Sequence, residues 1–168
     1  MKFSIVTSFY NTSEYVDKLY NSVLSQTYQN WEWIVTDDFS EVSAKNQLLE
    51  LSKKDSRIKY IDQEFKQEIY WNPHKYSSPD TDFIIQFDSD DTYDPKLLEV
   101  YKHFFMLYPD VSCLVSGGQR KYKDGRWKNY LFGDTRYLNS ADSRTKFGLS
   151  ETMLVTRAWR HIPYPTGS

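Results

Sequence analysis

Short apolar runs alternate along the chain with longer stretches in which apolar residues recur every three or four positions. The apolar runs predict buried strands at residues 3–6, 31–36, 58–61, 83–87 and 111–115. The longer stretches have the spacing of one helix face, and they predict helices over residues 15–24, 40–51 and 95–105. Strands that alternate with helices are typical of an α/β fold. We therefore expect a mostly parallel sheet with helices on both faces.

Polar residues mark where each predicted helix begins. Thr12 or Ser13 is a suitable N-cap for the first helix, and Ser40 for the second. Asp94-Pro95 gives the third helix an N-cap and a proline at its first position. The apolar spacing of this third helix assigns its inner face to Leu97, Leu98, Tyr101, Phe104 and Phe105.

Two further local signals lie on either side of the strand at residues 111–115. Residues 63–70 have the spacing of a short helix, which Asn72-Pro73 would end. Asp124-Gly125 lies between two short runs that contain Lys, Arg and aromatic residues, and this dipeptide is the strongest short hairpin signal.

The C-terminal part has a weaker pattern. Residues 131–146 are polar and irregular, which predicts a loop. Residues 151–156 predict one more strand, which leads into a short helix near Arg157. No repeat or interdomain linker is evident, so we expect a single domain over residues 1–168, with a short mixed C-terminal part.

Composition narrows the possible functions. The chain has 168 residues, enough for one core, and its 17% aromatic content can fill that core. The net charge is -2 with scattered Lys and Arg, which argues against a nucleic-acid binder. The single Cys113 excludes an internal disulfide and a cysteine-rich zinc site. No apolar run approaches the roughly 20 residues that span a bilayer, so we expect a soluble, cytoplasmic protein.

Acidic residues follow two of the predicted strands. Asp37-Asp38 comes after the second strand, and Asp88-Ser89-Asp90-Asp91 after the fourth. In open α/β sheets, ligands bind in the crevice at the carboxyl ends of the strands. Three carboxylates in four residues repel one another unless a cation or hydrogen-bond donors compensate them. A Mn²⁺ or Mg²⁺ ion bridging carboxylates to substrate phosphates would do so, whereas a solvated loop that caps a helix is the simpler alternative.

Four ordered motifs between Phe3 and Gly118 together resemble the family 2 glycosyltransferases of the GT-A fold. The motifs are Ser4-Ile5-Val6-Thr7-Ser8-Phe9-Tyr10-Asn11, Ser22-Val23-Leu24-Ser25-Gln26-Thr27-Tyr28, Trp33-Ile34-Val35-Thr36-Asp37-Asp38-Phe39-Ser40 and Phe87-Asp88-Ser89-Asp90-Asp91. The resemblance implies a GT-A-like, Rossmann-like sheet that binds a nucleotide-diphosphate sugar through residues 1–118. Residues 119–168 would form a short acceptor-side part.

The resemblance implies a nucleobase site formed by residues of the first and third motifs. Ser8 would lie at the edge of the base pocket, and Tyr10 near the base itself. Asp38 would accept a hydrogen bond from the base, usually uracil, so the donor would be a UDP-sugar. Asp37 would have a structural role.

The resemblance also implies a diphosphate and metal site. Asp88 and Asp90 would lie by the ribose and diphosphate, with Asp90 as the first metal ligand and Asp91 as the second. Asn72 lies near an Arg-Asn pair of the family. Trp71 stands where the arginine would be, which removes a helping contact to the diphosphate.

The catalytic base is the least defined part of the prediction. An inverting transfer needs a general base, which the family usually places downstream of a segment resembling residues 150–157. The chain ends at Ser168, about where that motif would begin, as in a small or shortened member. Glu151 ranks first as a substitute, followed by Asp134 and Asp142; all three are also ordinary surface carboxylates in the simpler interpretation.

Other polar and aromatic side chains have weaker claims. His103 falls inside a predicted helix and is expected at the surface, while His74 has no assigned role. His161 near the tail is a marginal metal candidate. Trp127 and Tyr130 are candidates for stacking on a sugar, although hairpin packing explains them as well.

Three functions are compatible with these residues. The first is a metal-dependent, inverting glycosyltransferase that acts on a saccharide or other hydroxyl acceptor. The second is a catalytically weak domain that binds a nucleotide sugar without transferring it. The third, a nucleotidyltransferase, is disfavoured because no Gly-rich loop with Lys or Arg follows the first strand.

Overall fold

The computed structural model describes residues 1–63, 76–111, 113–122, 124–130 and 157–160. The strands are β1 (Phe3–Phe9), β2 (Trp31–Asp37), β3 (Ile58–Asp62), β4 (Phe83–Gln86), β5 (Cys113–Val115), β6 (Gly118–Lys121), β7 (Trp127–Tyr130) and β8 (Arg157–Arg160). The helices are α1 (Val16–Leu24), α2 (Val42–Lys54) and α3 (Leu97–Leu107), and a 3-10 turn, η1 (Ser13–Tyr15), precedes α1. No helix in these ranges is long and apolar enough to cross a lipid bilayer.

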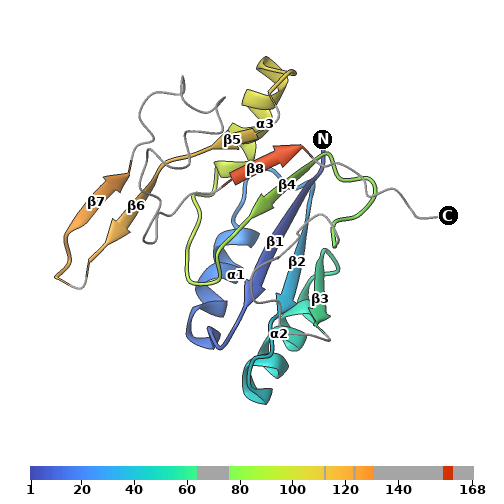
Figure 1. Ribbon diagram of the computed structural model, residues 1–168, viewed down its shortest axis with the longest axis vertical. Coiled ribbons are helices and arrows are strands. Elements are labelled where there is room, and N and C mark those ends of the chain that lie inside the picture. Colours follow the sequence, from blue (N-terminus) through green and yellow to red (C-terminus); the bar gives the residue numbers. More distant parts are fainter. Residues whose placement is uncertain (64–75, 112, 123, 131–156, 161–168) are drawn as a thin grey trace, which may run out of the picture. The chain divides into compact units, whose positions relative to one another are not determined.

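The main sheet has the strand order β3-β2-β1-β4-β8-β5. Figure 1 shows β3, β2, β1 and β4 side by side, and β1 pairs in parallel with both β2 and β4. Phe3 lies opposite Trp31 on one side and Phe83 on the other. The chain runs from β1 outward to β2 and β3, and β4 then lies on the far side of β1. This reversal of strand order makes the β1/β4 boundary the switch point at which such sheets bind ligands.

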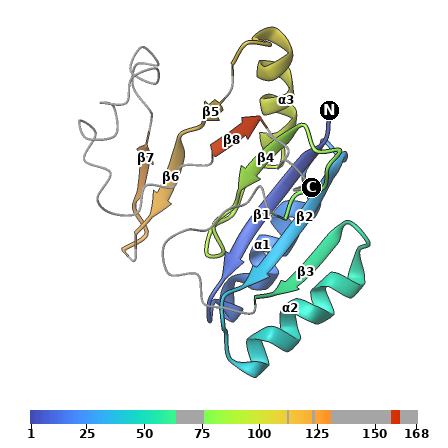
Figure 2. The same ribbon diagram turned by 45° about the vertical axis from the view of Figure 1, so that its right-hand side comes forward.

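One face of the sheet carries the main core. Residues at alternate positions of β1, β2 and β4 pack there against buried residues of all three described helices, as alternation along a strand requires. In Figure 2, α1 lies behind β1 and β2, and α2 runs alongside β3. The helical side chains in this core are Val16, Leu19, Val23, Leu48, Leu51, Leu98, Tyr101 and Phe105. The α/β, mostly parallel architecture predicted from the sequence is confirmed. The helices were expected on both faces of the sheet, but the described helices all pack on this one face.

The opposite face holds a smaller apolar cluster and a buried carboxylate. Val6, Ile34 and Ile84 form the cluster, with Ile61 and Tyr76 packed against it. Near the amino ends of the strands, Glu32 on β2 is only 4% exposed. Its carboxylate accepts hydrogen bonds from Lys59 Nζ at 2.7 Å and from the backbone N–H of Ser78 at 2.8 Å.

Hydrogen bonding decides the charge state of this buried carboxylate. Burial alone would raise the pKa of Glu32, but hydrogen bonds from Lys59, Ser4 and Ser78 outweigh it and lower the pKa to about 2. Glu32 is therefore an ionised group that ties β1, β2 and β3 to the segment before β4.

The predicted helix starts are partly wrong. Neither Thr12 nor Ser13 caps α1: the carbonyl of Thr12 accepts a hydrogen bond from Tyr15 N in η1, and α1 follows without a side-chain cap. Glu41, not Ser40, is the N-cap of α2. The hydroxyl of Ser40 instead accepts a hydrogen bond from Asn11 N at 3.0 Å. Ser40 therefore joins this turn to the loop after β1, whereas the buried Thr12 hydroxyl has no hydrogen-bond partner among the described residues.

The third helix, α3, begins at Leu97, two residues later than the start predicted at Pro95. Asp94 Oδ1 accepts a hydrogen bond from Lys96 N at 2.8 Å, so Asp94 closes a turn that precedes α3. Along α3, Leu98, Tyr101 and Phe105 are buried as predicted, whereas Phe104 is 42% exposed and Leu97 only partly buried. His103 is exposed, as expected.

The chain divides into two compact units. The first runs from Met1 to Leu114 and resumes at Ala158, and the second is Val115–Arg157. In the second unit β6 and β7 pair antiparallel, and Gly125 has a φ of 85° in the turn between them, which is permitted for glycine. The hairpin predicted at Asp124-Gly125 is confirmed.

The remaining C-terminal predictions have mixed outcomes. Arg157 belongs to strand β8, so the short helix predicted near it is wrong. The loop at residues 131–146 and the strand at 151–156 lie outside the described residues, as does almost all of the helix predicted at 63–70. Cys113 is exposed and forms no disulfide.

Candidate functional site

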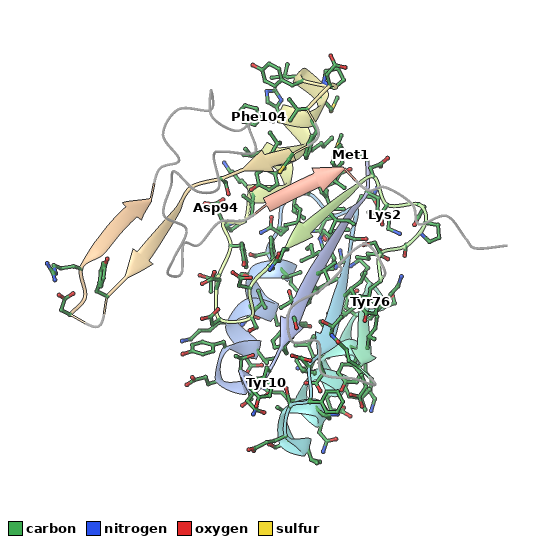
Figure 3. All side chains as sticks on the ribbon, in the orientation of Figure 1. Met1, Lys2, Tyr10, Tyr76, Asp94 and Phe104 are labelled. Carbon is green, nitrogen blue, oxygen red and sulfur yellow. The ribbon has the colours of Figure 1, made fainter. Side chains whose placement is uncertain are left out.

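The segments that follow β1, β2 and β4 carry the acidic and aromatic candidates, and they meet at the carboxyl edge of the parallel sheet. Asp38 follows β2, and its backbone N–H donates to Phe9 O at 2.8 Å, which fixes it beside the end of β1. On the other side of β1, Phe87 N donates to Val6 O at 3.0 Å, so the chain enters the Asp88 loop next to the same strand. Figure 3 shows Tyr10 at this edge, at the opposite end of the sheet from Met1 and Lys2. The geometry therefore brings together the residues expected to bind a nucleotide.

The side chains at the ends of β1 and β2 are accessible. Ser8 is exposed, Tyr10 is 51% exposed, and Asp38 is half-buried. A tyrosine and a carboxylate at neighbouring strand ends can offer a flat apolar surface and a hydrogen-bond acceptor to one ligand. A nucleobase, which has a flat face and a hydrogen-bonding edge, fits this combination.

Hydrogen bonds join the loop after β1 to the loop after β2. Asn11 Oδ1 accepts a hydrogen bond from Glu41 N at 2.8 Å, in addition to the bond from Asn11 N to Ser40. Two residues in these loops have left-handed backbones: Asn11 with a φ of 51° and Phe39 with a φ of 64°. Asparagine adopts this conformation readily, whereas phenylalanine does not.

Asp37 is a structural residue beneath this edge. It is fully buried, and its Oδ2 accepts a hydrogen bond from Ser40 N at 3.2 Å and pairs with Lys45 Nζ at 3.6 Å. Lys45, on α2, also pairs with Asp62 at 2.8 Å. These contacts hold the turn after β2 and agree with the structural role expected for Asp37.

Tyr93 holds the Asp88–Asp91 loop in place. Its hydroxyl oxygen accepts a hydrogen bond from Asp88 N at 2.6 Å, and its ring stacks on Phe87 with centroids 3.5 Å apart. Gln86 Nε2 donates to Asp88 Oδ1 at 3.2 Å. The loop is therefore anchored by a core aromatic residue on each side of the acidic cluster.

The acidic loop concentrates negative charge. Burial, followed by the neighbouring charges of Asp90 and Asp88, raises the pKa of Asp91 to about 7. Burial and the charges of Asp91 and Asp88 also raise the pKa of the Tyr93 hydroxyl. Tyr15 in η1 has its pKa raised mainly by a hydrogen bond with Glu14 and also by the charge of Asp90, which puts Asp90 within electrostatic reach of the start of α1.

Asp90 and Asp91 can supply only part of the coordination shell of a hard divalent cation. Asp90 is exposed and Asp91 half-buried, and no described Lys, Arg or His forms an ion pair with either of them. Among the described residues, no group of three or more His, Cys, Asp or Glu side chains is arranged to hold a metal ion. Oxygen ligands from substrate phosphates would have to complete the shell, as is usual for Mg²⁺.

Several predicted site residues lie outside the described residues. These are Asn72, Trp71 and His74 before β4, and Asp134, Asp142, Glu151 and His161 toward the C-terminus. Their proposed roles in diphosphate binding, metal binding and base catalysis stay predictions. Trp127 and Tyr130 lie on β7, and their role in sugar stacking also stays a prediction.

Sequence reasoning missed four residues that shape the site. Lys45, Tyr93 and Phe39 contact its supporting groups, and the fourth, Gln63, is 7% exposed and donates its backbone N–H to Asp37 O at 3.3 Å. The side-chain amide of Gln63 has no hydrogen-bond partner within the part of the chain that the structure describes. No periodic signal identifies any of the four, because their contacts depend on how the loops around the site fold.

The comparisons with known proteins agree with this geometry. The family model described as glycosyl transferase family 2 matches residues 4–161. The chain belongs to this family. WfgD of Escherichia coli, a UDP-Glc:alpha-D-GlcNAc-diphosphoundecaprenol beta-1,3-glucosyltransferase, is 37% identical over 100 residues, which cover 58% of this chain and 38% of WfgD. Glycosyltransferase GlyA of Streptococcus pneumoniae is 26% identical over 149 residues, covering 87% of this chain but only 21% of GlyA.

Solved structures show the same fold. Staphylococcus aureus TarS 1-349 in complex with UDP-GlcNAc has a TM-score of 0.69 and 24% identity, covering 96% of this chain and 46% of that one. The mannosyltransferase PcManGT of Pyrobaculum calidifontis, in complex with GDP-Man and Mn²⁺, has a TM-score of 0.58 and 12% identity, covering 71% of this chain and 36% of that one. The GT-A fold and the family assignment predicted from the sequence are thus confirmed. The chain spans less than half the length of each of these four relatives.

Proposed function

We propose that this protein binds a nucleotide-diphosphate sugar, with UDP-sugars as the preferred class, and transfers the sugar to a hydroxyl acceptor. The observation that carries the proposal is the convergence of Tyr10, Asp38 and the Asp88–Asp91 loop on one edge of the sheet. Family membership supports glycosyl transfer, and the UDP-Glc and UDP-GlcNAc named for WfgD and TarS support a UDP-sugar.

The base and ribose would be held by residues at three strand ends. Tyr10 would contact the base, Asp38 would accept a hydrogen bond from its N–H edge, and Ser8 would line the pocket rim. Asp88, oriented by Gln86 and Tyr93, would lie by the ribose and diphosphate with Asp90. Asn72 would add a polar contact to the diphosphate.

The diphosphate brings further negative charge to an acidic loop, so binding needs a counterion. Asp90 and Asp91 would hold Mn²⁺ or Mg²⁺, which when bound neutralises charge that develops on the leaving diphosphate. Two carboxylates and the phosphates together supply the oxygen ligands that neither supplies alone. Metal and nucleotide should therefore bind cooperatively.

Transfer with inversion requires a base near the acceptor hydroxyl. Glu151 is the proposed base, on the acceptor side implied by the family resemblance. Incubation with a panel of UDP-sugars and Mn²⁺, with release of UDP measured, tests for transfer or donor hydrolysis. Turnover that disappears in Glu151→Gln supports this role, and unchanged turnover reassigns the base. Donor binding without turnover on any acceptor would favour a binding domain over an enzyme.

A further inference from the structure

Phe39 has a backbone conformation that its side chain does not favour. Its φ of 64° lies in the left-handed region, where a side-chain Cβ crowds the backbone. Bulky residues are rare in this region, and they cluster at functional sites where the surrounding structure holds them. A glycine at this position would adopt the same turn without strain.

Burial of the ring does not account for a phenylalanine at this position. The side chain is 45% exposed. Its described ring contact is Lys45, whose Nζ lies 5.6 Å from the ring centroid. Lys45 is already held by Asp62 at 2.8 Å and by Asp37 at 3.6 Å, so this cation has carboxylate partners without the ring.

The turn around Phe39 is fixed by other groups. Ser40 N donates to Asp37 Oδ2 at 3.2 Å, and Asp38 N donates to Phe9 O at 2.8 Å. Asn11 connects to the same turn through Ser40 and Glu41. None of these hydrogen bonds uses the Phe39 side chain, so the turn does not require an aromatic residue.

We propose that the Phe39 ring forms a wall of the nucleobase subsite and stacks on the flat face of the donor's base. The inference rests on the proposed function, because it assigns this ring to the base that Asp38 would recognise at its edge. Phe39 directly follows Asp38 at the end of β2, and its exposed ring is available to a ligand. The strained backbone costs free energy in the protein without ligand. A stacked base would offset this cost, because the ring gains a partner when the ligand binds.

Two substitutions separate the ring from the backbone. Phe39→Ala removes the ring and keeps the left-handed strain, whereas Phe39→Gly removes both. We expect both variants to lose affinity for UDP with Mn²⁺ by about 5-fold to about 150-fold, the range for one base stacked on an aromatic side chain. Phe39→Gly should have a higher Tm than Phe39→Ala, and Phe39→Trp should keep UDP affinity within about 3-fold of the wild type.

Isothermal titration calorimetry of the full chain with UDP, GDP and pyrophosphate, each with Mn²⁺, tests the inference. Affinity for pyrophosphate should not change in any Phe39 variant, because pyrophosphate has no nucleobase to stack on the ring. Val42→Ala is the matched control, since Val42 lies three residues away and is 74% exposed; its UDP affinity should equal that of the wild type.

Each outcome separates this inference from the proposed function. A wild-type protein that binds neither UDP nor GDP contradicts both. Wild-type binding that is unchanged in Phe39→Ala and Phe39→Gly overturns the role of Phe39 and leaves the proposed function standing. Equal losses for UDP and pyrophosphate also overturn it, because they would mean that Phe39 supports the loop and does not contact the base.

Discussion

At the residue scale, Asp91 and Glu32 are carboxyl groups whose pKa values move in opposite directions. Asp91 lies beside Asp88 and Asp90, while Glu32 accepts hydrogen bonds from a lysine, serines and a backbone N–H. The first arrangement opposes the negative charge and the second stabilises it. The difference matches their places in the sheet: Asp91 follows the carboxyl end of β4 in the candidate site, and Glu32 lies near the amino end of β2.

Asp91 should reduce the stability of the metal-free protein at neutral pH. Its pKa rises from 3.8 to about 7 on folding, so the folded state holds the proton more tightly and stability falls as the pH rises between these values. Asp91→Asn should therefore raise the Tm more at pH 8 than at pH 5, in thermal denaturation with a chelator present. The exposed Asp17→Asn should show no such pH-dependent difference. An equal Tm change at both pH values for Asp91→Asn would contradict the electrostatic account of the loop.

Glu32 should have the opposite effect. Its pKa falls from 4.5 to about 2 on folding, so its contribution is complete above pH 4.5 and is lost as the pH falls toward 2. Glu32→Gln should reduce the free energy of unfolding by about 1–3 kcal/mol at pH 7, because the hydrogen bonds of a buried charged group are weakened. Urea denaturation at pH 7 and pH 3 measures the change, which should be smaller at pH 3.

Glu50→Gln is the matched control for Glu32. Glu50 pairs with Lys53 at 2.6 Å, but both side chains are more than half exposed. Such surface pairs contribute within about 1 kcal/mol. A loss in Glu50→Gln as large as that in Glu32→Gln would mean that burial of Glu32 has no special importance.

At the element scale, α3 shows how two neighbouring aromatic residues can differ in importance. Phe105 is 2% exposed and stacks on Phe83 with centroids 3.7 Å apart, whereas Phe104 is 42% exposed. Phe105→Ala should reduce the free energy of unfolding by about 3–5 kcal/mol, the usual cost for a buried phenylalanine. Phe104→Ala should cost less than about 1 kcal/mol. Chemical denaturation measures both, and equal costs would contradict the described orientation of α3.

The sequence predicted the elements better than their ends. The strands were predictable because β1, β2 and β4 each contain a short apolar run, as expected of strands that are buried on both faces. The helix starts were not, because Ser40 bonds to Asn11 in the loop after β1 and Asp94 closes a local turn with Lys96 before α3 begins. The inner face of α3 was partly misassigned, because Phe104 fits the apolar period as well as Phe105 does.

The candidate site was also predictable only in part: the positions of its acidic residues could be predicted, but the conformation of its loops could not. The position of Asp38, Asp88 and Asp90 at one edge of the sheet could be predicted, because residues that follow parallel strands lie at the carboxyl edge. The conformation of Phe39 could not be predicted, since it depends on hydrogen bonds between the loops after β1 and β2. The anchoring of the acidic loop by Tyr93 likewise needs the folded geometry.

At the scale of the whole molecule, the strand order explains why these residues meet. The order β3-β2-β1-β4 puts the ends of β2 and β4 on either side of β1, although more than 40 residues separate Asp38 from Asp88 in the sequence. A ligand at this edge would contact base-binding groups on one side and the acidic loop on the other. Membership of glycosyl transferase family 2 accords with a nucleotide-sugar donor as that ligand.

The central claim is metal-dependent binding of a nucleotide diphosphate at this edge, and one calorimetric titration tests it directly. UDP is titrated into the wild type and into Asp90→Ala, first with Mn²⁺ and then with a chelator. Asp17→Ala is the control for removal of an exposed aspartate. Circular dichroism verifies that each variant is folded. We predict that the wild type and Asp17→Ala bind UDP only with Mn²⁺, and that Asp90→Ala loses this binding while it stays folded. Equal UDP affinity of the wild type with Mn²⁺ and with chelator, or unchanged affinity in Asp90→Ala, would contradict the account.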